Sequence, residues 1–297
     1  MSEIRRPIEL GVSVNPAADG LEQARAIVRA AEAGGLDLVG IQDHPYQSRF
    51  LDTWALIATL LAETRHLRFF PNVASLPLRP PAMMAKAAAS LDRLSDGRFE
   101  LGLGAGASAD RAATMGGPRR SPGESVEALE EAIELVRLAW SDQDEVWFEG
   151  RHYRLDGYQP GPPPAHPIEI WLGAYRPRML RLTGRLADGW IPSMGYLPPE
   201  HLGERSAVVD RAARDAGRDP AEVRHAYNVS GTITGNGGPG GPLDGPVEHW
   251  IDTLGGWASE LAVDTFIVWP QGDDPAAQVE LFAADVAPRL RALSPPR

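Results

Sequence analysis

Apolar stretches of two kinds alternate along this chain from one end to the other. Short runs rich in β-branched residues, such as Ile8–Val14, are typical of strands that are buried on both faces. Longer segments, such as Leu21–Ala33, repeat their apolar positions at the spacing of a helix that packs one face against a core. The pattern therefore predicts an α/β protein in which strands and helices alternate.

Eight strands and eight helices can be counted. The predicted strands are Ile8–Val14, Leu38–Gln42, Leu67–Ser75, Phe99–Leu103, Ile168–Leu172, Gly189–Pro192, Val223–Gly231 and Thr265–Trp269. The predicted helices are Leu21–Ala33, Trp54–Ala62 with Asp52 or Thr53 as its N-cap, Pro80-Pro81 to Leu94, Glu124–Trp140, Pro177–Ala187, Pro198–Gly217, a segment after Pro246, and Pro275–Leu293. A closed parallel (β/α)8 TIM barrel requires this count. A doubly wound open sheet shares the alternation and is the alternative fold.

Three stretches interrupt the alternation. A loop is predicted over Gly104–Gly123, and Ser141–Pro167 contains proline and glycine clusters around a possible hairpin at Glu145–Leu155. We interpret the second stretch as an insertion at the barrel edge between strands four and five, so residues 1–297 are expected to form a single domain. Glycine and proline dominate Gly235–Pro246, which predicts a mobile loop.

Composition narrows the class of protein. The net charge of −11 argues against nucleic acid or an anionic membrane as a partner, because both require a basic surface. The chain has no cysteine, which excludes disulfides and thiolate metal ligands, and its seven histidines show no metal-binding spacing. Its amino terminus lacks the apolar core of a secretory signal, and the longest largely apolar stretch is far shorter than the ~20 residues of a membrane span. A cytoplasmic location is expected.

Asp43-His44, after the second predicted strand, is the sharpest candidate for chemistry. Functional residues of a barrel lie at the carboxyl ends of its strands. An imidazole exchanges protons near neutral pH, and a neighbouring carboxylate adjusts its basicity and tautomer. The alternative is structural: Asp43 caps a turn before Pro45, and His44 is an ordinary loop residue.

Two glycine-containing turns are candidates for binding a flat ligand with a phosphate. Gly102–Gly106 (Gly-Leu-Gly-Ala-Gly) lacks the full dinucleotide fingerprint, but its backbone is clear of side chains, so a ring system could approach it closely. Gly173–Pro177 joins strand five to a helix, where backbone amides and Arg176 suit a phosphate. Each turn can equally be an ordinary connection between a strand and a helix.

Taken together, these segments resemble the bacterial luciferase-like family of flavin- and deazaflavin-dependent oxidoreductases. The resemblance covers nearly the whole chain. Its motifs, in order, are Asp43-His44, LPLRPPAMMAK (76–86), LDRLSDGRFELGLGAG (91–106), MGGPRRSPGE (115–124), WLGAYRPRM (171–179) and ADGWIPS (187–193). The run 91–106 is specific, whereas the dipeptide alone is not.

The resemblance implies a cofactor ring held over the strand ends, with coenzyme F420 favoured over FMN. It implies that His44 donates or accepts a proton beside the reacting carbon, and that relatives carry a non-proline cis peptide in the segment matching Val73-Ala74-Ser75. The residues implied to contact the ring are Asp43, Val73, Ala74, Ser75, Gly104, Ala105 and Gly106, and those implied to hold the phosphate are Gly173, Ala174, Tyr175, Arg176 and Pro177. A homodimer acting on a small-molecule substrate is expected.

One departure from the family bears on the substrate. The family's sugar-phosphate dehydrogenases carry a catalytic glutamate after the strand-four glycine turn, where this chain has Gly106-Ala107-Ser108, so a sugar phosphate is not expected. The leading hypothesis is hydride transfer between F420 and a small organic substrate. The alternatives are an FMN-dependent monooxygenase supplied by a flavin reductase, a non-catalytic cofactor-binding protein, and a barrel lyase or hydrolase without a redox cofactor.

Overall fold

A computed structural model describes residues 6–235 and 240–295 and contains the predicted barrel. Its main sheet has the strand order β3-β2-β1-β11-β10-β9-β8-β5-β4, and every pairing in it is parallel. The strands are β1 (Glu9–Val14), β2 (Leu38–Ile41), β3 (Arg68–Pro71), β4 (Ala74–Ser75), β5 (Leu101–Gly104), β8 (Ile170–Leu172), β9 (Gly189–Trp190), β10 (Arg224–Gly231) and β11 (Thr265–Pro270). A parallel bridge between Phe69 and Phe99 joins β3 to the segment before β5 and closes the sheet on itself.

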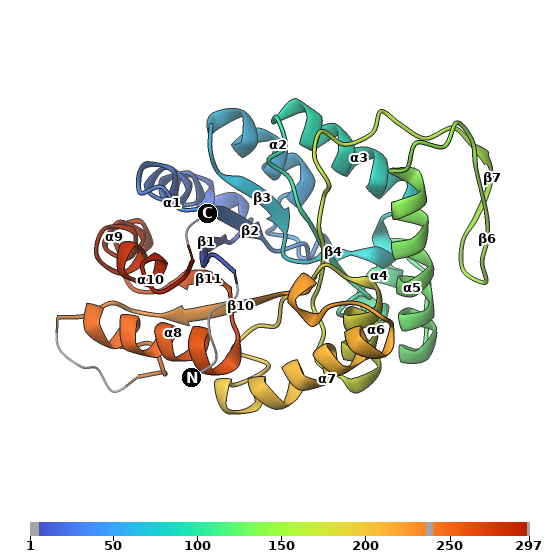
Figure 1. Ribbon diagram of the computed structural model, residues 1–297. Coiled ribbons are helices and arrows are strands. Elements are labelled where there is room, and N and C mark those ends of the chain that lie inside the picture. The colour runs from blue at the N-terminus through green and yellow to red at the C-terminus, as the bar shows by residue number, and fades with distance from the viewer. Residues whose placement is uncertain (1–5, 236–239, 296–297) are drawn as a thin grey trace.

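Helices surround the strands (Figure 1). They are α1 (Leu21–Ala33), α2 (Thr53–Glu63), α3 (Pro81–Leu94), α4 (Ala109–Thr114), α5 (Pro122–Ala139), α6 (Pro177–Leu186), α7 (Leu202–Asp215), α8 (Val247–Leu261), α9 (Pro275–Leu281) and α10 (Ala287–Arg291). A π-helical turn, Phe282–Val286, joins α9 to α10. None of the helices in the described part of the chain is both long and apolar enough to cross a membrane.

The predicted elements differ from the observed ones in a few places. The third predicted strand, Leu67–Ser75, is split into β3 and β4 around Asn72-Val73, whose peptide bond is cis. The predicted loop Gly104–Gly123 contains the short helix α4, for which the Ser108 hydroxyl serves as N-cap by accepting a hydrogen bond from the Arg111 amide. Part of the predicted mobile loop, residues 236–239, lies outside the described residues.

A separate hairpin projects from the barrel beside α5 (Figure 1). Its strands are β6 (Val146–Glu149) and β7 (Arg154–Tyr158), which pair antiparallel between α5 and β8. The carboxylate of Glu131 on α5 accepts hydrogen bonds from three successive backbone amides in the connecting turn, those of residues 151–153, at 2.8–3.1 Å. These bonds fasten the hairpin to the outer helix layer.

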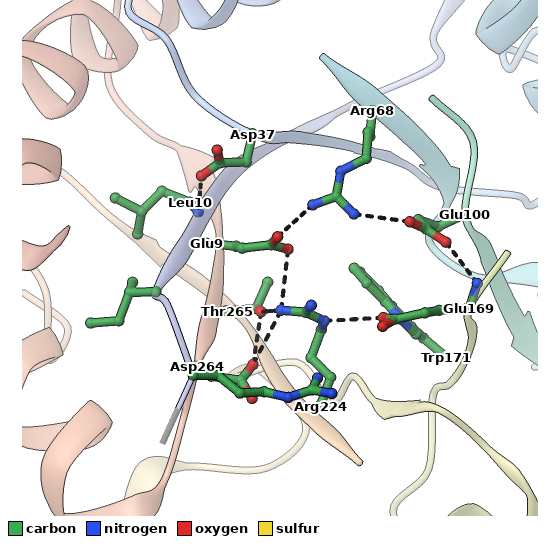
Figure 2. A network of polar contacts seen from close by, with 12 residues as sticks. Glu9, Leu10, Asp37, Arg68, Glu100, Glu169, Trp171, Arg224, Asp264 and Thr265 are labelled. Carbon is green, nitrogen blue, oxygen red and sulfur yellow. Dashed lines mark hydrogen bonds and ion pairs between the residues drawn. The ribbon is translucent and has the colours of Figure 1, made fainter. Parts of the chain in front are cut away.

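Charged side chains fill the amino end of the barrel (Figure 2). Arg68 contacts Glu9 at 2.7 Å and Glu100 at 2.9 Å, while Arg224 contacts Glu9 and Glu169, each at 3.1 Å. These residues come from the starts of different strands, so the ion pairs tie the strands together across the barrel. Buried charges are stable only when they are paired in this way.

An apolar layer lies above this network, nearer the carboxyl ends of the strands. It consists of Leu38, Phe70, Trp171, Ile191, Ala226 and Ile267. Gly189 leaves room for the Trp171 indole, because a Cβ at position 189 would lie 2.6 Å from a ring carbon. The barrel interior is therefore closed below the strand ends where function is expected.

His166 extends the charged network toward the protein surface. Its Nδ1 lies 2.7 Å from the fully buried carboxylate of Asp92, and its Nε2 lies 3.3 Å from Glu100. Two hydrogen bonds raise the pKa of His166 to about 10, and the bond to Asp92 has a larger effect than the bond to Glu100. The imidazolium is thus a structural cation at neutral pH.

We predict that His166 makes the stability of the protein depend on pH. Its pKa is higher in the folded chain than the unfolded value of about 6.5, so its contribution is complete below pH 6.5 and is lost as the pH rises toward 10. His166→Gln should lower the free energy of unfolding by about 2 kcal/mol at pH 6 and by much less at pH 10. Urea unfolding of both proteins across this range measures the difference, and parallel curves would contradict the prediction.

Candidate functional site

All the residues that the sequence suggested for the site lie at the carboxyl end of the barrel. Asp43 and His44 follow β2, Val73 separates β3 from β4, and Ala74 and Ser75 form β4. Gly104 ends β5, with Ala105 and Gly106 directly after it, and the segment 173–177 connects β8 to the first residue of α6. In a parallel barrel these strand ends share one face.

Val73 is the point at which three of these strand ends meet. A Cβ on Gly104 would lie 2.7 Å from Cγ2 of Val73, and a Cβ on Gly173 would lie 3.2 Å from the same atom. Ser75 pairs with Gly104 in the sheet, and the Gly173 amide donates to the Leu103 carbonyl at 3.4 Å. The two glycines therefore provide the space that the half-buried Val73 side chain occupies.

Asp43 links the end of β2 to β4. Its side chain is 1% exposed, and Oδ2 accepts a hydrogen bond of 3.0 Å from the Ser75 amide. Burial raises the pKa of Asp43, while the Ser75 amide and the nearby Arg79, whose Nε is 3.7 Å away, act in the opposite direction. Among the described residues, the buried Oδ1 has no hydrogen-bond partner.

His44 is half-buried and is held by a tyrosine that the sequence reasoning missed. Its Nδ1 lies 2.9 Å from the hydroxyl of Tyr46, and no described residue forms a hydrogen bond with its Nε2. Burial is the main cause that lowers the pKa of His44, so the ring is neutral at pH 7. The guanidinium of Arg111, on α4, lies 5.7 Å from the centre of the Tyr46 ring.

The two predicted residues that follow β5 lie against neighbouring side chains. Gly106 has a φ of +102°, which favours glycine, and a Cβ there would also lie 2.6 Å from Pro77. Ala105 is partly buried against the main core. These contacts define the path of the chain after β5.

The segment after β8 is anchored at its start and exposed at its end. The carbonyl of the fully buried Ala174 accepts from the Trp190 indole at 2.9 Å, and the Tyr175 hydroxyl accepts from the Ser193 amide at 3.1 Å. Arg176 is exposed at the N-cap of α6, and Pro177 is the first helical residue. The arrangement presents a cation and a helix amino terminus to solvent, as a phosphate site requires.

Two asparagines span the barrel beneath the site. Asn72 Nδ2, at the end of β3, donates to Asn228 Oδ1 on β10 at 2.6 Å, and Asn228 Nδ2 donates to Ser193 Oγ at 3.1 Å. In the strand order, β3 and β10 stand on opposite sides of the barrel. The amide pair therefore forms a polar floor under the strand ends.

A cleft of about 340 Å³ opens at the neighbouring ends of β1 and β11. Its described walls include Ser13, Asn15 and Trp269, together with Arg49 from the segment that follows His44. Backbone hydrogen bonds of 2.8 Å, from the residue 18 amide to the residue 49 carbonyl and from the residue 51 amide to the residue 16 carbonyl, join the two loops. The cleft is thus bounded in part by the loop that carries the histidine.

Comparison with known proteins identifies the relatives of this chain. The family model described as "Luciferase-like monooxygenase" matches residues 5–234. A phthiodiolone/phenolphthiodiolone dimycocerosates ketoreductase of Mycobacterium tuberculosis is 36% identical over 188 residues, which are 62% of this chain and 48% of that protein.

Solved structures share the fold at low sequence identity. An F420-dependent secondary alcohol dehydrogenase in complex with an F420-acetone adduct superposes with a TM-score of 0.83 at 19% identity, over 96% of this chain and 99% of the other. The riboflavin lyase RcaE with modified FMN and riboflavin gives 0.86 at 17% identity, over 98% and 93%. Likeness at this identity is evidence for the barrel only. The family assignment instead comes from the sequence match, which covers more than three quarters of the chain: this protein belongs to the luciferase-like monooxygenase family.

Proposed function

We propose that this protein is an oxidoreductase that transfers a hydride between a deazaflavin coenzyme of the F420 type and a small organic alcohol or carbonyl compound. The observation that carries the proposal is a neutral His44 beside a buried Asp43, whose Oδ1 lacks a partner among the described residues. Asp43 is joined through the Ser75 amide to β4, next to Val73, where three strand ends meet. The names of the ketoreductase relative and of the alcohol dehydrogenase with a similar fold are compatible with such chemistry.

The residues present fit a flat ring at this junction. Gly104 and Gly173 leave the space that the Val73 side chain needs, and this half-buried side chain is proposed to lie against the ring. The buried Asp43 Oδ1 has no partner among the described residues, so it could accept a hydrogen bond from a ring N–H if a small local shift exposed it. The residues proposed to contact the ring are Asp43, Val73, Ala74, Ser75, Gly104, Ala105 and Gly106, and those proposed to hold the phosphate are Gly173, Ala174, Tyr175, Arg176 and Pro177.

His44 is proposed to move the proton that accompanies the hydride. The chemistry that a deazaflavin supplies when bound is exchange of a hydride with the substrate carbon. In carbonyl reduction, Nε2 of His44 gives a proton to the oxygen, and in alcohol oxidation Nε2 accepts the hydroxyl proton when the ring carries its own proton on Nδ1. Asp43 holds β4 beside this histidine through the Ser75 amide.

The choice between coenzymes is tested by direct binding. We predict that the purified protein binds oxidised F420 at least tenfold more tightly than FMN, measured by fluorescence titration under the same conditions. Tight binding of FMN with no binding of F420 would replace the proposal with the FMN-dependent monooxygenase. Binding of neither would favour a barrel lyase or hydrolase.

The role of His44 is tested by substitution. His44→Ala should lower the turnover of a small alcohol by at least about 100-fold while F420 binding is retained, because only the proton acceptor is removed. In the unsubstituted enzyme, alcohol oxidation should persist below pH 6.5, because His44 has a lowered pKa and stays neutral there. Stopped-flow measurement of F420 reduction gives both results. Full turnover by His44→Ala with the coenzyme bound would remove this role.

The proposed role of Gly104 in coenzyme binding is tested with a pair of variants, one at this glycine and one at a control glycine. Gly104→Ala should weaken F420 binding at least tenfold, because its Cβ would lie 2.7 Å from Val73 and force that side chain to move. Gly195→Ala is the control, since a Cβ there has no neighbour within 4 Å among the described residues. Equal affinities for the two variants would show that Val73 does not border the coenzyme.

A further inference from the structure

The neutral state of His44 raises a question of proton supply. Reduction of a carbonyl group requires a proton for the oxygen once the carbon has accepted a hydride. A neutral imidazole that gives away its Nε2 proton becomes an imidazolate unless Nδ1 gains a proton at the same time. Burial lowers the pKa of His44, so the neutral ring is the main form at pH 7, and this form can donate from Nε2 only if a second group supplies a proton to Nδ1.

Tyr46 is in contact with that nitrogen. Its hydroxyl is 2.9 Å from Nδ1 of His44, and the two rings are inclined by 41° with their centroids 5.6 Å apart. The side chain is partly buried, and among the described residues the hydroxyl has no other hydrogen-bond partner. A phenol is a better donor than acceptor, and the lone pair of a neutral imidazole nitrogen is a good acceptor. The contact therefore favours donation from Tyr46 to Nδ1, which leaves the histidine proton on Nε2.

Arg111 acts on the same hydroxyl from α4. Its guanidinium lies 5.7 Å from the centre of the Tyr46 ring. A cation over the ring face withdraws electron density and makes the phenol a stronger donor. Burial raises the pKa of Tyr46, and Arg111 is the main influence in the opposite direction. Asp43 and Tyr196 are the other titratable groups that act on Tyr46, and Asp43 and Arg111 are those that act on His44.

We propose that Tyr46, assisted by Arg111, is the positioning residue that fixes the His44 tautomer and supplies the proton in carbonyl reduction. The inference rests on the proposed function and extends it to this tyrosine. The carbonyl carbon accepts a hydride from reduced deazaflavin, and the former π electron pair, now on oxygen, takes the proton from Nε2. Nδ1 takes the proton of the Tyr46 hydroxyl, and water then reprotonates the phenolate beside Arg111.

The proposed proton relay, from Tyr46 through His44 to the substrate oxygen, is tested by the pH dependence of ketone reduction in Tyr46→Phe. In the unsubstituted enzyme, small ketones such as acetone and cyclohexanone should be reduced at a rate that stays constant between neutral pH and the pH at which Tyr46 ionises. Without the hydroxyl, only protonated His44 can donate. The variant should therefore be slower at neutral pH, and its rate should fall about tenfold for each pH unit above that, because the protonated fraction of His44 falls by that factor. A merely structural loss would lower the rate equally at every pH, and that outcome would overturn the relay.

Tyr153→Phe is the matched control. Tyr153 also lies under an arginine, with Arg120 5.2 Å from its ring centre, and also forms a hydroxyl contact, yet it sits on the hairpin side of the molecule. Its loss should leave both the rate and the pH profile unchanged.

A measurement without substrate or coenzyme separates failure of the relay from failure of the proposed function. The ¹⁵N shifts of His44 should report a proton on Nε2 in the unsubstituted protein and a mixture of tautomers in Tyr46→Phe. A proton on Nδ1 in the unsubstituted protein would refute the proposed donation even if the enzyme turns over ketones. The expected shifts combined with no hydride exchange with any ketone would instead leave the Tyr46 contact intact and refute the oxidoreductase assignment.

Discussion

The ion pairs of Arg68 and Arg224 at the amino end of the barrel are the interaction on which the rest of the architecture depends. Each guanidinium is shared between carboxylates from different strands, and Glu9 bridges the two arginines. Removing one partner from such a network costs up to about 3–5 kcal/mol where the charge left unpaired is buried, as those of Arg224 and Glu100 are. The strands of the barrel are thereby held together at one end by charge pairing that tolerates little displacement.

The opposite end of the barrel follows a different principle. There several strands end in, or are followed by, small or polar residues such as Gly104, Gly173 and Asp43. Val73 lies against Gly104 and Gly173, and Asp43 is joined to Ser75 through a backbone amide. This division of labour is typical of the fold, in which one end provides stability and the other provides function.

Periodicity was sufficient to predict most of the fold. The bounds of α1 were correct, because the apolar spacing of Leu21–Ala33 is regular and ends at glycine. The short helix α4 was missed, because six residues flanked by glycines produce no helical period, although Ser108 was a visible N-cap. The interruption of the third strand at Asn72-Val73 has no signature in an apolar run.

The candidate site was predicted as a set of strand ends, but its contacts were not. That Asp43 and Val73 would share one face follows from the barrel itself. The contact between Tyr46 and His44 depends on how the loop between β2 and α2 folds, and the ion pair between Glu9 and Arg224 joins residues more than 200 positions apart. Local sequence patterns carry no information on contacts between residues so far apart in the sequence.

The pair of asparagines beneath the site has a consequence for how this protein can change over generations. Each amide both gives and receives a hydrogen bond, and the two side chains come from strands on opposite sides of the barrel. Replacement of Asn72 alone by leucine would leave Oδ1 of Asn228 without its donor, and the reverse change would leave both polar atoms of the Asn72 amide without their partners. The two positions are therefore expected to be inherited as a unit, with any lineage that loses one amide under pressure to replace the other.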